Sequence, residues 1–132
     1  MWKKRVIHVP ELVDPIHKPS HEQCVVAGPL VFVAGMTGWK KGAISENFSD
    51  QARQAFENIK VALNAAGAGL DDIVIMTVYL TDVRYQPEFS RIRREILGNT
   101  LSSSATIGIN QLFDPRALIE IQATAVLQDA QS

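Results

Sequence analysis

The chain has 132 residues, of which 46% are hydrophobic and 20% are charged, and its formal net charge is −1. This length suits one ordinary domain, residues 1–132, large enough to fold without disulfides or metal ions. The charge balance argues against nucleic acid as a partner, and no apolar run approaches the ~20 residues that a membrane helix needs. The cationic start is followed by too short an apolar stretch for a signal peptide, so we expect a cytoplasmic protein with no membrane attachment.

Three β runs open the chain, over residues 5–9, 23–27 and 30–35. Gly28-Pro29 separates the second run from the third and predicts a hairpin. Cys24, the single cysteine, lies in an apolar run and is interpreted as a buried small hydrophobe, so neither a disulfide nor a cysteine-based metal cluster is expected.

The histidines lie early in the chain. His17 and His21 are four residues apart, but Pro19 between them argues against the helix that would aim both at one metal. We expect no metal site and place His21 at the edge of a pocket instead. Because the chain has no phosphate loop or dinucleotide fingerprint, we expect no cofactor.

Two helices are predicted in the middle of the chain. Ser49 can cap the first, which carries an apolar stripe at three- and four-residue spacing and ends at Gly67. A β-branched strand follows over residues 73–80. The second helix begins near Pro87 and stops at Gly98.

Two strands with alternating patterns close the chain, over residues 102–109 and 118–127. In the last strand the odd positions are apolar, and Glu120 and Gln122 occupy even positions. In the strand before it, Ile107 is at an odd position, and Ser104 and Thr106 are at even ones. We expect the apolar sets to lie under the helices, and the polar sets to share the opposite face in neighbouring strands.

The predicted fold class is therefore α+β, in the order βββαβαββ: one six-stranded mixed sheet with two helices packed on one face. Two helices cover only one side of such a sheet. Leu118 and Val126 have the same parity as Glu120, so packing the uncovered face against other copies would bury them. We expect an oligomer.

Several stretches of the chain resemble, in order, the Rid family of reactive intermediate deaminases, also called YjgF. The resemblance covers about residues 20–128, and its matching stretches are residues 30–35, 51–59, 66–73, 77–82 and 118–125. It implies a chorismate-mutase-like fold, hydrolysis of imines or enamines, and a homotrimer with small-molecule sites between subunits.

The same resemblance assigns site residues. Glu120 matches a glutamate that positions or activates water, and Gly35 matches a glycine whose backbone lines the pocket. Active members carry an arginine after a Pro-Ala pair, which binds the substrate carboxylate. The matching tripeptide here is Ser102-Ser103-Ser104, so a serine occupies the arginine position. Phe89 stands where an asparagine is usual, and His21-Glu22 where a Tyr-Ser pair is usual.

These departures predict altered specificity. A serine cannot supply two charged donors, so ordinary 2-imino acids should bind poorly and be deaminated weakly or not at all. Arg116 lies four residues from Glu120, about 13 Å along a strand, and can replace the missing charge only from a neighbouring subunit. Ser104→Arg should therefore gain affinity for small carboxylates. Thr106 and Gln122 complete the candidate substrate-binding residues.

The leading hypothesis is a divergent Rid-type hydrolase or deaminase acting on a small enamine, imine or related C–N metabolite at clefts between subunits. Whether the protein is an enzyme stays open, because Glu120 can equally make a structural hydrogen bond. The alternative is a non-catalytic trimeric metabolite-binding or regulatory protein. A nuclease comes third, since the charge balance offers no phosphate-neutralising surface.

Overall fold

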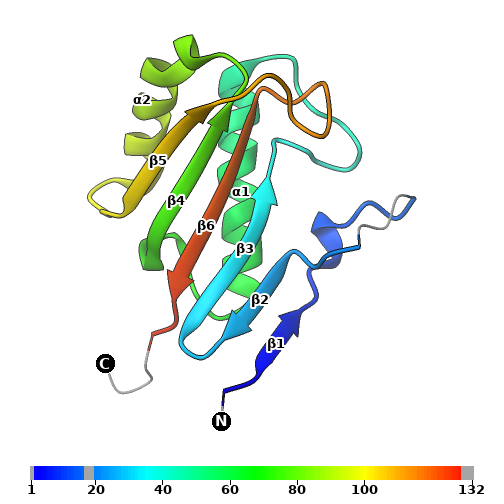
Figure 1. Cartoon of the computed structure of the whole chain (residues 1–132), viewed down its shortest axis with the longest axis vertical. Coiled ribbons are helices and arrows are strands. Elements are labelled where there is room, and N and C mark those ends of the chain that lie inside the picture. The colour runs from blue at the N-terminus through cyan, green and yellow to red at the C-terminus, as the bar shows by residue number, and fades with distance from the viewer. Residues whose placement is uncertain (1, 17–19, 129–132) are drawn as a thin grey trace.

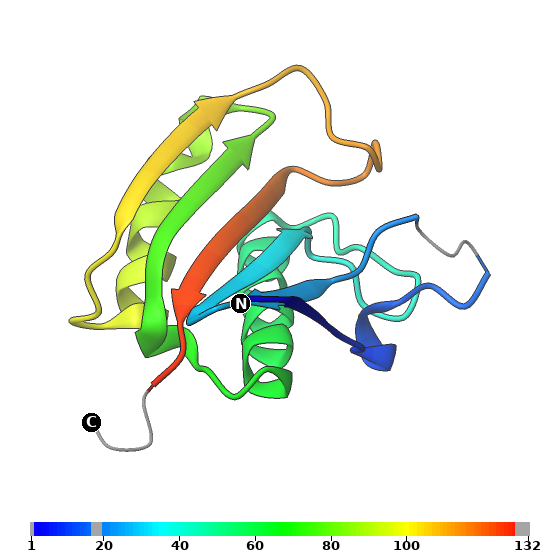
Figure 2. The ribbon, with the colours of Figure 1, turned by 60° about the horizontal axis from the view of Figure 1, so that its bottom comes forward.

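The computed structural model describes residues 2–16 and 20–128, which form one six-stranded sheet in the order β1-β2-β3-β6-β4-β5. The strands are β1 (Lys4–Ile7), β2 (Cys24–Ala27), β3 (Leu30–Met36), β4 (Ile73–Leu80), β5 (Ser103–Gly108) and β6 (Ile119–Val126). Helices α1 (Phe48–Ala65) and α2 (Gln86–Leu97) lie on one face of the sheet (Figures 1 and 2). The predicted α+β class and element order are confirmed.

The sheet is mixed because its pairs are antiparallel except for β4 with β5, which are parallel. The β2–β3 hairpin turns at Gly28, whose φ of 59° favours a residue without a side chain. Strand β4 lies between β6 and β5. The expectation that the last two strands are neighbours is therefore wrong, since α2 carries the chain across to the outer edge of β4.

Helix α1 is held to the sheet by its apolar stripe. Ala52, Ala55, Phe56, Ile59, Ala62 and Leu63 are all buried, as the spacing predicts. The cap differs from the prediction, because the helix begins one residue before Ser49 and Asn47 accepts the Asp50 amide at 3.0 Å. The Asn47 side chain is the one that reaches a free first-turn N–H.

Helix α2 packs beside α1 through aromatic rings. Pro87 lies in its first turn, and Gly98 ends it with a φ of 57°. The rings of Phe56 and Phe89 stack with centroids 5.9 Å apart, and Phe89 is fully buried. Phe89 therefore belongs to the core between the helices.

Alternation predicts the faces of β6 correctly and those of β5 incorrectly. Ile119, Ile121, Ala123 and Ala125 of β6 are buried under the helices. In β5, the register pairs Ser104 with buried Met76 and Thr106 with buried Val78, so both polar residues point to the helix side. Ile107 points to the other side and is 41% exposed. As an edge strand that the helices leave exposed, β5 takes its facing from its parallel pairing with β4.

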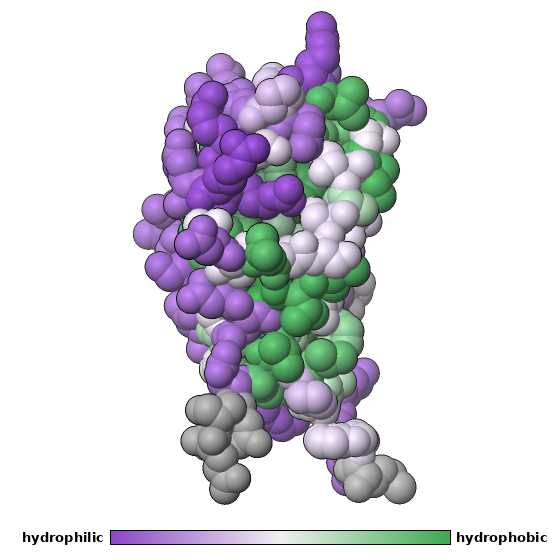
Figure 3. All heavy atoms as spheres, turned by 90° about the vertical axis from the view of Figure 1, so that its left-hand side faces the viewer, coloured by the Kyte–Doolittle hydropathy of each residue, from purple (hydrophilic) through white to green (hydrophobic). Residues whose placement is uncertain are grey.

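The sheet side without helices, called here the open face, carries exposed apolar groups. One cross-strand row on it runs through Val6, Val25, Phe32, Thr124 and Ile75. Phe32 and Ile75 are 44% and 45% exposed. Figure 3 shows hydrophilic side chains on one side of the molecule and hydrophobic ones gathered on the other.

No helix of the described part of the chain has the length and apolarity needed to cross a membrane.

Candidate active site

A cleft of about 550 Å³ lies where β3 and β6 meet the loops that precede β2 and β6. Four of the residues predicted for the site line it together: His21, Gly35, Glu120 and Gln122. Ser104, Thr106 and Arg116 are absent from its lining. His17 and Pro19 lie outside the described residues.

Glu120 and Gly35 form the closest pair in the cleft. The pairing of β3 with β6 shifts register between Val33 and Met36, and Gly35 lies in that irregularity. A Cβ atom on Gly35 would lie 2.5 Å from Oε2 and 2.7 Å from Cδ of Glu120. The carboxylate of Glu120 thus lies directly against the backbone of Gly35. A residue with a side chain would collide with it, which explains why this position is a glycine.

The environment of Glu120 favours the protonated form of its carboxyl group. Burial raises the pKa of its carboxyl group above the ordinary value, and the charge of His21 acts in the opposite direction. Within residues 2–16 and 20–128, no group donates a hydrogen bond to this carboxylate. A half-buried carboxylate facing a cleft is suited to act as a general base or acid.

Buried amides of α1 hold the cleft's loop after β3. Asn58 is 5% exposed and donates to the carbonyl oxygens of Thr37, at 3.0 Å, and Trp39, at 2.8 Å. The loop lies against the helix at Gly38, where a Cβ atom would come within 2.7 Å of the Gln51 Cα atom. Asn58 therefore fixes the wall to which Trp39 belongs.

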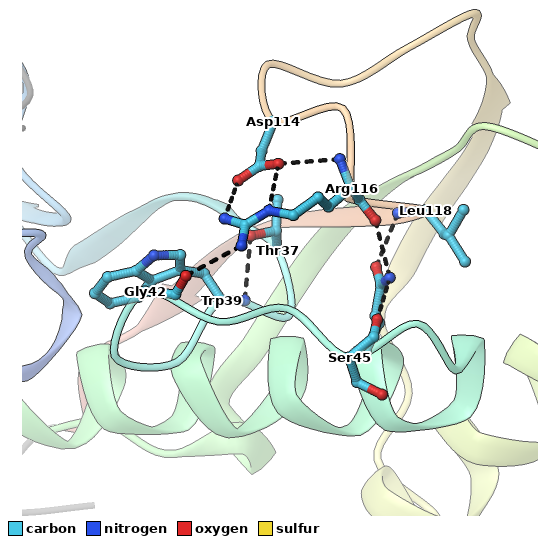
Figure 4. A network of polar contacts seen from close by, with 8 residues as sticks. Thr37, Trp39, Gly42, Ser45, Asp114, Arg116 and Leu118 are labelled. Carbon is cyan, nitrogen blue, oxygen red and sulfur yellow. Dashed lines mark hydrogen bonds and ion pairs between the residues drawn. The ribbon is translucent and has the colours of Figure 1, made fainter.

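Gln51 holds the loop before β6 to the same helix. Its amide nitrogen donates to the carbonyls of Ser45 at 2.7 Å and Arg116 at 3.1 Å, and its oxygen accepts the Leu118 amide at 2.8 Å (Figure 4). Sequence reasoning missed both Gln51 and Asn58. The available signal was two amide side chains, seven residues apart, on the apolar face of a predicted helix.

Arg116 is engaged within its own chain. Its Nε and Nη2 atoms donate to Asp114 at 3.0 and 2.7 Å, and Nη1 donates to the Gly42 carbonyl at 3.1 Å (Figure 4). The guanidinium lowers the pKa of Asp114. Asp114, and not Arg116, lines the cleft, so the arginine acts here as an anchor for the loop before β6.

Ser104 and Phe89 are placed away from the cleft as well. The Ser104 hydroxyl accepts a hydrogen bond from Arg93 Nη1 of α2 at 2.9 Å, on the helix side of the sheet. The expectation that Ser104 and Thr106 share the face of Glu120 is therefore wrong. Phe89 lies in the core and does not reshape the cleft.

Residues 2–16 and 20–128 contain no group of three or more His, Cys, Asp or Glu side chains placed to hold a metal ion. Cys24 is buried, and its burial raises the pKa of the thiol.

Comparison with known proteins places the chain in a family. Residues 13–127 match the model of the family described as Endoribonuclease L-PSP. A RutC family protein of Pyrococcus horikoshii is 34% identical over 126 residues, which cover 92% of this chain and 97% of that protein. The chain belongs to this family, also known as Rid or YjgF.

Two further proteins are similar to this chain over most of its length. A 2-iminobutanoate/2-iminopropanoate deaminase of Salmonella typhimurium is 32% identical over 111 residues, covering 79% of this chain and 84% of that protein. The crystal structure of E. coli TdcF with bound serine matches with a TM-score of 0.86 at 25% identity, over 94% of this chain and 99% of that one. The chorismate-mutase-like fold and the resemblance inferred from the sequence are confirmed.

Proposed function

We propose that this protein is a Rid-type hydrolase that acts on a small enamine, imine or related C–N metabolite. The observation that carries the proposal is the Glu120 carboxylate, which faces the cleft against Gly35 without a donor from the described residues. The imine deaminase among its relatives supports the reaction class. Gln122 and His21 are the proposed substrate-binding neighbours.

In the proposed reaction, Glu120 acts on water. It takes a proton from the water whose oxygen attacks the C=N carbon, and passes that proton to the nitrogen. A second transfer, from the new hydroxyl group to the nitrogen, breaks the C–N bond and releases ammonia and a carbonyl compound. An enamine is first converted to the imine by taking a proton on carbon and losing one from nitrogen. Burial of Glu120 supports these transfers, because a raised pKa lies closer to neutrality.

The proposed working form is a homotrimer of one Rid-family domain, residues 1–132, with its sites between subunits. The open face supports this proposal, because Phe32 and Ile75 stay exposed on it in the single chain. Packing that face against neighbouring copies would bury them. If light scattering finds a stable monomer at micromolar concentration, the proposal that the sites are shared between subunits is wrong.

The competing function is a trimeric metabolite-binding or regulatory protein without turnover. It is favoured by the absence of lysine and arginine from the described lining of the cleft, since ordinary 2-imino acids are anions. RNA cleavage has less support, because a net charge of −1 and this lining provide no surface that neutralises phosphates.

The test is ammonia release from enamines and imines generated in situ. We expect turnover that Glu120→Gln abolishes and that Glu57→Gln, the same change on the exposed face of α1, leaves intact. Turnover that survives Glu120→Gln would exclude Glu120 as the reacting group. Ligand binding without turnover of any C–N compound would establish the non-catalytic alternative.

A further inference from the structure

We propose that the cleft selects a planar cationic C–N group, of the amidinium or iminium class, over a carboxylate. This inference deepens the proposed function and rests on the same cleft. It assigns to the site a preference for cationic ligands, whereas ordinary 2-imino acids are anions.

The charges around the cleft support this preference. The ionisable side chains that one chain contributes to the lining, among its described residues, are Asp14, His21, Asp114 and Glu120, so none of these contributes a permanent positive charge. Asp114 is paired with Arg116, and Asp14 accepts the Ile16 amide at 2.8 Å. Glu120 is the carboxylate that faces the cavity, and a ligand carboxylate placed beside it would be repelled.

The hydrogen-bonding groups match a donor-rich ligand. Both oxygens of Glu120 accept nothing from the described residues, and an amidinium presents two parallel N–H groups that fit one carboxylate bidentately. Gln122 follows on the same face of β6 and adds an amide oxygen. Trp39 also lines the cleft, and an indole ring is a surface of the kind that attracts cations.

Within the chain, the guanidinium groups of Arg93 and Arg116 are directed away from the cleft. Arg93 donates to Ser104 on the helix side, with its guanidinium carbon 5.5 Å from the Phe89 ring centroid. Arg116 is held by Asp114 and the Gly42 carbonyl. On β5, the open-face positions on either side of Ser104 are Ser103 and Ala105, which are uncharged.

The test compares two nearly isosteric probes of opposite charge, benzamidinium and benzoate. Calorimetric titration of the full-length protein at neutral pH should give benzamidinium at least about tenfold higher affinity than benzoate. Glu120→Gln should reduce benzamidinium affinity by at least about tenfold. Glu57→Gln, the matched change away from the cleft, should leave it unchanged.

Three results would overturn the inference: tighter binding of benzoate, no binding of benzamidinium, or benzamidinium binding that Glu120→Gln does not weaken. The turnover assay separates this failure from failure of the proposed function. Glu120-dependent hydrolysis of uncharged enamines, together with a preference for benzoate, would refute the charge preference alone. Glu120-dependent benzamidinium binding without hydrolysis of any C–N compound would support the charge preference and refute the hydrolase.

Discussion

Strands β6 and β5 carry similar alternating patterns and yet are arranged differently. In β6, the apolar residues face the helices and Glu120 and Gln122 face the open side. In β5, Ser104 and Thr106 face the helix side and Ile107 lies on the open face. The two strands differ in position, since β6 is central and β5 is at the edge.

This difference shows when alternation predicts facing. A central strand under a helix is stabilised by burial only when its apolar side chains point to that helix. Its observed register therefore agrees with the facing that its alternating pattern predicts. An edge strand that the helix leaves exposed has little burial to gain on either side. Its facing is decided by pairing with β4 and by contacts such as that between Arg93 and Ser104.

The largest expected effect is on stability and separates the two strands directly. Ile121→Ala should reduce the free energy of unfolding by about 2–5 kcal/mol, because Ile121 is fully buried. Ile107→Ala should cost less than about 1 kcal/mol within the chain, because Ile107 is 41% exposed. Urea unfolding at several protein concentrations measures both, and equal losses would contradict the assignment of β5 as a weakly packed edge.

The next effect tests the polar side of β6. Gly35→Ala would place its Cβ atom 2.5 Å from Glu120 Oε2 and displace the carboxylate. Turnover, or ligand affinity if the protein only binds, should fall about 100-fold. Gly69→Ala is the matched control, since its Cβ atom would meet only Asp72 Oδ2 at 3.9 Å. Full activity in Gly35→Ala would show that the carboxylate position is unimportant.

A smaller effect concerns the pH dependence of stability. Burial raises the pKa of Glu120 in the folded state, so the folded chain loses stability as pH rises from the ordinary value of 4.5 through the folded pKa. Glu120→Gln removes this loss. The variant should therefore have a slightly higher melting temperature than the original protein at neutral pH, and this difference should disappear below pH 4.5. Thermal melts from pH 4 to 8 measure the difference. A difference that grows as the pH falls would contradict the prediction.

The smallest effect tests the facing of β5. Ser104→Ala should lose the hydrogen bond with Arg93 and cost less than about 1 kcal/mol, whereas Ser103→Ala on the open face should cost nothing measurable. Contrary to the expectation from sequence, Ser104→Arg should gain no affinity for small carboxylates, because its guanidinium would lie beside Arg93. A gain measured by calorimetry would show that β5 turns its even positions to the cleft in the assembled protein.

Local pattern by itself determined much of this protein. The stripe of α1 and the apolar side of β6 follow from periodicity, because in each case burial and spacing favour the same arrangement. The β2–β3 hairpin follows from the turn residues Gly28-Pro29 between two β runs. Family motifs in the sequence also identified Gly35 and Glu120, which the fold brings into contact.

Only the tertiary structure decided the rest. The roles of Gln51 and Asn58 depend on loops separated from α1 in sequence, with Gln51 reaching Leu118 across 67 residues. Arg116 is held by Asp114 and the Gly42 carbonyl, and Ser104 is bonded to Arg93. The pattern of a single segment does not predict these partners. Periodicity reports which residues of one segment share a face, whereas register and loop contacts arise from pairing between distant segments.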